Sequence, residues 1–361
     1  MLMIIIAFLS FLGLIVLHEL GHFILAKKFG VKVEEFGIGY PPRLFGKKIG
    51  ETIYSLNLLP FGAFVRIYGE SEEIKDADNQ RSFGAKPIWQ RALIVLGGVM
   101  SFWIVSIILL SIVMALGAPT VIGDEDSQNL VNPKVQITAV ASGSPAEIAG
   151  LKVGDTVRQF SVSGQNFTIN KVAELQSLIE QNKGKEVVLT VERGKETLQE
   201  KATPRISPPE GQGPMGVALI RTALKSFPWY RAPFEGIIAT ANLTASVFIG
   251  WGQALKNVFI GKPTGVQLVG PVGIFSLFAQ VSQLGIVYFL QFIAIISVYL
   301  AVFNILPIPA VDGGKILFLI IEKIRKKPVP PKIEQNISSV FFILLLAMMI
   351  WVTVKDVIHL F

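Results

Sequence analysis

Long apolar runs, separated by ordinary polar sequence, are the main feature of the chain. The first run covers residues 1–26, and no lysine or arginine precedes it, so we expect a retained helix rather than a cleaved signal peptide. Further runs cover 92–118, 284–304 and 337–355, each close to the roughly 20 residues that a helix needs to cross a bilayer. The pattern therefore predicts an α-helical polytopic membrane protein with four transmembrane helices.

Composition and charge support this prediction and orient the spans. Of the 361 residues, 51% are apolar and 16% are charged, which argues against a purely soluble enzyme. The loop at 27–91 holds 11 lysine and arginine residues and the loop at 305–335 holds 6, so the positive-inside rule places both in the cytoplasm. Because the formal net charge of +7 lies mostly beside the spans, we expect the lipid bilayer, and no nucleic acid, as a partner.

A fifth apolar run, 234–260, is assigned to the membrane interface. Its polar residues recur at helical intervals and form one narrow stripe, which is typical of an amphipathic helix lying on a membrane. One more crossing would also put the two basic loops on opposite sides of the membrane. The stripe consists of Glu235, Asn242, Ser246, Gln253 and Asn257.

Residues 132–223, between the second and third spans, predict an inserted extracytoplasmic α+β domain. Strands of alternating polarity flank a segment, 144–155, that predicts a short helix, its glycine terminus and a turn into the next strand. This arrangement resembles a PDZ domain. Such a domain would capture peptide C-termini along an edge strand that includes Met215, Gly216 and Val217, or it would exclude substrates with bulky outer domains.

The candidate chemistry lies at the end of the first run, in the sequence His18-Glu19-Leu20-Gly21-His22. Positions i and i+4 of a helix share a face, so both imidazoles can reach one zinc ion while Glu19 lies beside it. The alternative is a pair of interfacial histidines. Ionisable residues inside a span are costly and usually functional, which favours the metal site.

A catalytic zinc site needs a third protein ligand and an open position for water. The chain has no cysteine, and its remaining histidine, His359, lies at the far end of the last span, so we expect a carboxylate. The best candidate is Asp312, just beyond the third span on the same side as His22. Zinc lowers the pKa of a bound water toward about 7, so Glu19 could take its proton and return it to a leaving amine. The residues therefore predict peptide hydrolysis.

These residues and several further motifs resemble the site-2 protease family, of the bacterial regulator-of-sigma-E-protease type. The motifs are H-E-L-G-H, Phe36-Gly37-Ile38-Gly39, Pro42-Arg43-Leu44, Leu59-Pro60-Phe61-Gly62 through Tyr68-Gly69-Glu70, Gly270-Pro271-Val272-Gly273-Ile274, and the N-x-x-P-x-P-x-x-D-G-G segment that begins at Asn304. The resemblance implies zinc bound by His18, His22 and Asp312, with Glu19 as catalytic base and Asn304 near the substrate or the developing oxyanion.

The resemblance also implies a bacterial plasma membrane location, with the active site toward the cytoplasmic side. It implies single-pass membrane protein substrates, of the anti-sigma factor or remnant signal peptide type. Two segments depart from the family pattern. Relatives usually carry Gly-Pro and Asn where this chain has 97–101, and Pro-Leu-Gly-Gly where it has 60–63. We expect neither departure to touch a proposed ligand.

A predicted β-hairpin follows the metal helix on the cytoplasmic side. Residues 52–58 and 63–68 predict two strands around a turn that ends at Gly62. A transmembrane substrate must unwind before hydrolysis, and its freed backbone groups then need new partners. An exposed edge with Gly62, Val65 and Ile67 could accept the substrate as an added strand. The alternative is a plain amphipathic cytosolic hairpin.

The leading interpretation is an intramembrane zinc endopeptidase. A second interpretation keeps the fold but makes the chain a catalytically inactive, membrane-tethered PDZ scaffold that binds peptides. The intact ligand set with Glu19 argues against it. A third is a metal transporter, which would normally repeat ligands along several spans, whereas the second and fourth spans supply almost none.

Overall fold

The computed structural model describes residues 2–70, 80–126, 131–194, 196–209, 211–262, 269–283 and 285–358. The chain divides into two compact units. Unit 1 comprises Met1–Ile112 and Tyr230–Phe361, and unit 2 comprises Val113–Trp229. The elements that begin in unit 1 are α1 (Leu2–Lys28), β1 (Val33–Ile49), β2 (Thr52–Ile67), α2 (Ile88–Leu116), α5 (Ala232–Phe259), α6 (Pro271–Gln283), α7 (Ile286–Ile305), α8 (Asp312–Arg325) and α9 (Pro331–Ile358).

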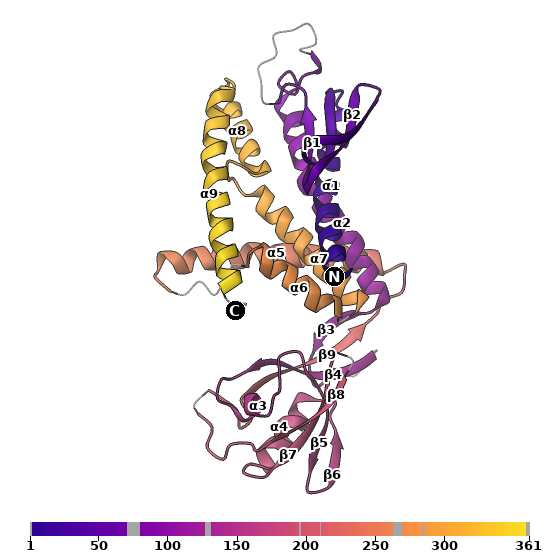
Figure 1. The fold of residues 1–361 in the computed structure, drawn as a ribbon, viewed down its shortest axis with the longest axis vertical. Helices are drawn as coiled ribbons and strands as arrows, with labels where there is room; N and C mark the ends of the chain where they lie inside the picture. Colours follow the sequence, from indigo (N-terminus) through magenta and orange to yellow (C-terminus); the bar gives the residue numbers. More distant parts are fainter. Residues whose placement is uncertain are drawn as a thin grey trace. The chain divides into compact units, whose positions relative to one another are not determined.

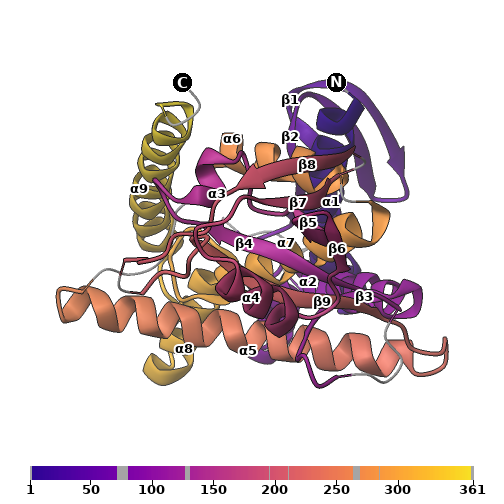
Figure 2. The same cartoon turned by 90° about the horizontal axis from the view of Figure 1, so that it is seen from below.

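Five helices within the described residues are long and apolar enough to cross a membrane, as a polytopic membrane protein requires. They are α1, α2, α5, α7 and α9. The four predicted spans correspond to α1, α2, α7 and α9. The fifth, α5, meets the same criteria, but Figures 1 and 2 show it lying across the direction of α9. Its assignment to the interface stays a prediction.

The hairpin of unit 1 differs from the predicted one. Its two strands are β1 and β2, and the chain reverses at Gly50 and Glu51. The predicted turn at 60–62 is wrong, because these residues lie inside β2. The reason is that β1, which the sequence analysis did not assign to a strand, supplies partners for both halves of β2.

The register places the first residues of β1, 33–38, between two parts of β2, residues 53–56 and 63–67. Phe36 of β1 has both Tyr54 and Val65 of β2 as partners. Gly62, at φ +141°, lies between the halves, where β2 bends. Among the strand pairings of the described residues, none lies on the outer side of residues 63–67. We call residues 63–67 the edge segment.

The sheet lies alongside the membrane helix α1 (Figure 1). The ring of Phe8 is 6.3 Å from that of Phe61, and Lys27 pairs with Glu51 at 2.7 Å, so the contacts extend along about 28 Å of helix. Large apolar side chains on this sheet are exposed, and a contiguous exposed apolar patch is typical of a surface that contacts another molecule or a membrane. They include Leu44, Phe45, Leu56, Leu58, Leu59 and Phe61.

The segment 305–335 is not the continuous loop that we expected, because α8 occupies its middle. Residues 306–311, which contain the two prolines, are indeed not helical. Phe318 and Leu319 of α8 are buried, so tertiary packing of an apolar face stabilises a helix here. Asp312 is consequently the first residue of a helix rather than part of a loop.

Unit 2 is an α+β unit with its own apolar core. Its elements are β3 (Ala118–Ile122), β4 (Val131–Val140), α3 (Pro145–Ile148), β5 (Thr156–Val162), β6 (Gln165–Thr168), α4 (Val172–Gln181), β7 (Val187–Arg193), β8 (Glu196–Ala202) and β9 (Val217–Lys225). The strands pair in the order β3-β9-β4-β5-β7-β8, and β6 pairs with β5. Ser144 caps α3, as the 144–155 pattern predicts.

Candidate metal centre

Three potential ligand atoms from α1 and α8 meet at one point in unit 1. The Nε2 atoms of His18 and His22 are 3.3 Å apart, and they lie 3.4 Å and 3.2 Å from Oδ2 of Asp312. Ligands bound at about 2.0–2.1 Å around a tetrahedral zinc ion would be separated by about 3.3 Å. In addition, Oδ2 of Asp312 is buried with no hydrogen-bond partner. The three residues therefore fit a zinc ion.

Helix α2 fixes the orientation of the two imidazoles. Nδ1 of His22 lies 2.9 Å from the carbonyl oxygen of Ile94. Because a carbonyl only accepts, Nδ1 carries the proton and Nε2 offers its lone pair to a metal. The ring of His18 stacks on Phe102, with centroids 4.7 Å apart. The sequence analysis missed both contacts, because they join residues distant in the chain.

Glycines allow α1 and α2 to approach closely enough for these contacts. A Cβ at Gly98 would lie 2.3 Å from Nε2 of His22 and 2.6 Å from Cε1 of His18. The backbones of α1 and α2 are in contact at Gly21 and Gly97, since a Cβ at Gly21 would lie 2.1 Å from the Gly97 oxygen. The expectation that the departure at 97–101 touches no proposed ligand is therefore wrong. The sequence contains Gly97 and Gly98, but no local pattern indicates that Gly98 faces the imidazoles.

Asp312 is positioned by the turn that precedes α8. The segment that begins at Asn304 passes close under the first turn of this helix. A Cβ at Gly313 would lie 2.0 Å from the Leu306 oxygen, and one at Gly314 would lie 2.5 Å from the Ile308 oxygen. Only glycines permit this close approach, so the paired glycines after Asp312 allow its helix to begin beside the histidines.

Charged neighbours surround the three ligand atoms. Glu19 lies close enough to His22, Asp312 and Lys315 to interact with them electrostatically. Lys315, which the sequence analysis did not single out, pairs with Glu70 at 2.5 Å. Although burial opposes it, the carboxylates of Glu70 and Asp312 raise the pKa of Lys315 above its usual range. Lys315 is therefore a fixed positive charge near the centre.

The remaining predicted site residues of unit 1 have other neighbours. The amide of Asn304 donates to the Leu300 carbonyl of its own helix at 2.9 Å. Gly62 lies under the ring of Tyr40. Ile67 is buried, and Val65 packs against the same apolar cluster. His359 lies outside the described residues.

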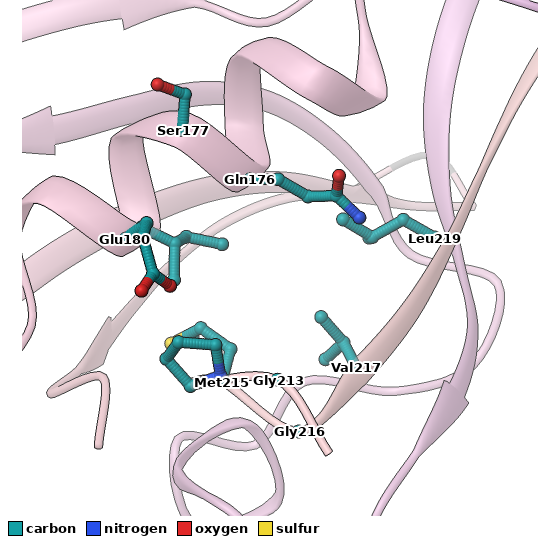
Figure 3. A pocket seen from close by; sticks show the side chains of 10 residues that line it. Gln176, Ser177, Glu180, Gly213, Met215, Gly216, Val217 and Leu219 are labelled. Atoms are coloured by element: carbon teal, nitrogen blue, oxygen red, sulfur yellow. The ribbon is translucent and has the colours of Figure 1, made fainter. Parts of the chain in front are cut away.

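Unit 2 contains a separate cavity of about 430 Å³ between α4 and the start of β9. Met215, Gly216 and Val217, the predicted peptide-contacting residues, line it. Figure 3 shows Val217 across the cavity from Gln176 of α4. Strand β3 pairs with residues 221–225 of β9, so among the described strand pairings the first residues of β9 keep a free edge beside the cavity.

Comparison with known proteins identifies the family. The chain matches Peptidase family M50 over residues 6–348. It is 35% identical to a protein of Clostridium perfringens that is named as a zinc metalloprotease, over 98% of both chains. A similarly named protein of Nostoc sp. is 31% identical over 95% of this chain and 92% of its own length. The regulator of sigma-W protease RasP of Bacillus subtilis is 28% identical over 99% of both chains. The chain belongs to Peptidase family M50, the site-2 protease family.

Proposed function

We propose that this chain is an intramembrane zinc endopeptidase that cuts peptide bonds within or near the transmembrane segments of other proteins. The observation that carries the proposal is the convergence of three ligand atoms, from His18 and His22 on the apolar helix α1 and from Asp312 at the start of α8, at separations of 3.2–3.4 Å. Family membership supports the protease activity. The names of the relatives support zinc as the metal.

His18, His22 and Asp312 would hold the zinc ion, and Glu19 would act as the general base. When bound, zinc supplies Lewis-acid chemistry, polarising a carbonyl and making water more acidic. Glu19 takes a proton from the attacking water and returns it to the nitrogen of the leaving amine. In our proposal the side-chain amide of Asn304 breaks its hydrogen bond to the Leu300 carbonyl oxygen. It then faces the substrate or the developing oxyanion.

The edge segment would present the substrate to this centre. An unwound transmembrane segment needs partners for its backbone groups, and a free sheet edge supplies them. Ile67 of the edge segment packs in one cluster with Ala26 of α1, Ile94 of α2 and Ile316 of α8. Because these helices also carry or orient the proposed ligands, an added strand would run close to the centre.

A proline substitution tests this role of the edge segment. Val65→Pro removes a backbone donor from residues 63–67, and Lys47→Pro removes one from the hairpin arm 43–49. We expect Val65→Pro to reduce cleavage of a membrane substrate and Lys47→Pro to leave it near the parent level. Unchanged cleavage by Val65→Pro would refute edge pairing.

The substrates we propose are single-pass membrane proteins, such as anti-sigma factors or remnant signal peptides. The relative from Bacillus subtilis is named a regulator of sigma-W protease, which supports a role of this kind. We place the chain in the bacterial plasma membrane with α1, α2, α7 and α9 as spans and α5 in the interface. The basic loops at 27–91 and 305–335 support a cytoplasmic active site and an extracytoplasmic unit 2.

We also propose that unit 2 is a PDZ domain that binds peptide C-termini, although a size filter is compatible with the same fold. The cavity between α4 and β9 supports peptide binding, because a free strand edge and an apolar wall adjoin it. An added strand along residues 216–219 would pair with this edge. Val217→Asp would then weaken peptide binding without changing the zinc content.

Conversion of Glu19 to glutamine separates the protease from the inactive scaffold. Glu19→Gln removes the base but none of the three ligands, so we expect zinc to be retained while cleavage of a reconstituted membrane substrate falls by at least about 10²-fold. Glu34→Gln, at the second residue of β1, is the matched control and should cut normally. Equal cleavage by the parent and Glu19→Gln would contradict the proposal.

A further inference from the structure

We propose that Arg66 selects substrates by charge: when a substrate strand pairs with the edge segment, the Arg66 guanidinium binds an acidic side chain opposite it and disfavours a basic one. This inference rests on the proposed function. It adds to the ligands and the base a residue that distinguishes one membrane protein from another. Arg66 would touch the substrate away from the reacting atoms, so it is a binding residue rather than a catalytic one.

Arg66 lies on the face of the sheet opposite the one that packs on the helices. Its neighbours in the edge segment, Val65 and Ile67, belong to an apolar cluster with residues of α1, α2 and α8. Because successive side chains of a strand point to opposite faces, Arg66 points away from this cluster. Its side chain is 60% exposed, so the guanidinium is accessible to a partner.

The charge of Arg66 is only partly compensated within the sheet. The carboxylate of Glu35, its cross-strand partner on β1, lies 3.8 Å away, which is longer than a hydrogen bond. Glu35 is buried, and it already accepts hydrogen bonds from Arg43 and Ser55, both at 2.7 Å. One buried carboxylate therefore faces two guanidinium groups, and these three charged side chains carry one net positive charge.

An added strand would bring one of its side chains directly opposite Arg66. Side chains opposite each other in neighbouring strands share a face, and their Cβ atoms are about 4.5–5.5 Å apart. A carboxylate on the substrate would thus lie within reach of the guanidinium, whose planar N–H donors suit a carboxylate. Opposite charges at such a position stabilise the pairing of two strands, and like charges destabilise it. Arg66 would therefore favour an acidic residue at this position of the substrate.

The orientation that we propose makes this preference selective. Ile67 packs in one cluster with Ala26, next to Lys27 and Lys28 at the end of α1 that we place on the cytoplasmic side. Cytoplasmic flanks of membrane spans carry an excess of lysine and arginine. Such flanks would set like charges against Arg66, whereas an acidic flank would pair with it. We therefore infer that the favoured substrates are spans with an acidic residue at their cytoplasmic end.

The test uses the full chain, reconstituted with single-span test peptides that share a leucine-rich core interrupted by a short Gly-Ser stretch. One residue on the cytoplasmic side of this stretch is Asp, Asn or Lys, and its position is moved along the peptide one residue at a time. Asp and Asn have similar shapes, so their comparison isolates charge. We expect a position at which kcat/KM falls from Asp through Asn to Lys, with about a fivefold difference between Asp and Lys.

Variants of Arg66 show whether this residue distinguishes the charges. We expect Arg66→Glu to reverse the order at the same position, Arg66→Gln to abolish it and Arg66→Lys to keep it. The matched control is Lys47→Glu, because Lys47 is an exposed basic residue on the opposite outer strand, 43–49, and this variant should keep the order of the parent. Arg66→Gln and Arg66→Lys keep the test decisive if the reversed charge beside Glu35 disturbs folding.

Two outcomes would overturn the inference. The first is equal cleavage of the Asp and Lys peptides by the parent at every position. The second is retention of the parent order by Arg66→Gln, because another group would then distinguish the charges. Failure of the parent to cut any of the peptides would instead count against the proposed function.

Discussion

Two carboxylates with buried oxygen atoms, Asp155 of unit 2 and Asp312 of unit 1, differ in how their hydrogen bonds are satisfied. In unit 2, the carboxylate of Asp155 accepts from Arg193 at 2.7 Å and 2.8 Å and from the backbone of Lys152. Arg221 donates to four backbone carbonyl oxygens. In unit 1, by contrast, Oδ2 of Asp312 has no hydrogen-bond partner and lies between two imidazoles.

This contrast distinguishes buried polar groups that stabilise the fold from buried polar groups that fit a metal ion. A buried polar group that serves the fold is paired, because an unpaired one costs about 1–3 kcal/mol. A cluster of acceptors at separations of 3.2–3.4 Å needs a metal ion or a shared proton to offset this cost. The polar network around Asp155 therefore stabilises unit 2, while the cluster around Asp312 fits the metal site that we propose.

The largest effect is expected from a substitution next to the metal centre that leaves every polar side chain in place. Gly98→Ala adds a Cβ that would lie 2.3 Å from Nε2 of His22 and 2.6 Å from Cε1 of His18, so the imidazoles or α2 must shift and the ligand geometry is disturbed. We expect zinc affinity and activity to fall by about 10–100-fold, as for other substitutions that displace metal ligands. Competition with a zinc-sensitive dye and a cleavage assay would measure the two effects.

The matched control is Gly13→Ala on α1, because nothing lies within 4 Å of a Cβ at that position. This variant should bind zinc and cut like the parent. Normal zinc binding by Gly98→Ala would show that the packing of α2 does not orient the imidazoles.

A smaller effect is expected from breaking the network of unit 2. Asp155→Ala removes the acceptor of the Lys152 N–H and leaves Arg193 with only the Gly150 carbonyl oxygen, which should cost about 1–3 kcal/mol. Limited proteolysis and thermal unfolding of the full chain would detect the loosened unit. Zinc content should not change. A loss of zinc in Asp155→Ala would mean that the polar network of unit 2 also serves the metal centre.

The smallest effect concerns an ion pair at the surface of unit 1. Hydrogen bonds from Lys27 and Arg81 hold the pKa of Glu51 below its usual range. A group with a lowered folded pKa stabilises the fold above its unfolded pKa and loses this contribution as the pH falls through the folded value. Glu51→Gln should therefore cost at most about 1 kcal/mol at neutral pH. The difference in melting temperature from the parent should vanish in acid, and a difference that grew there would contradict this assignment.

The sequence predicted the elements that depend on long apolar patterns. The candidate spans α1, α2, α7 and α9 stand out because each has to offer apolar side chains to lipid on most sides. The spacing of His18 and His22 could be interpreted because both lie on one helix face. Asp312 could be proposed by counting available ligands, since the chain lacks cysteine and has few histidines.

The sequence could not predict contacts that depend on packing between distant segments. Strand β1 was missed because its glycines and prolines hide the alternation of a strand, and it forms only where both halves of β2 pair with it. Helix α8 was missed because two prolines precede it and paired glycines lie in its first turn, both of which are typical of a loop. The contact of Gly98 with two imidazoles depends on how α1 and α2 cross, which no local pattern encodes.

The most direct measurement is the zinc content of three proteins, each stripped with a chelator and then supplied with one equivalent of zinc. The proteins are the parent, Asp312→Ala and the control Asp356→Asn. In the parent the Asp356 carboxylate accepts a hydrogen bond from the Gly273 backbone N–H and is not one of the proposed ligands. The account predicts close to one bound zinc per chain for the parent and for Asp356→Asn, and almost none for Asp312→Ala. Retention of a full equivalent by Asp312→Ala would contradict it.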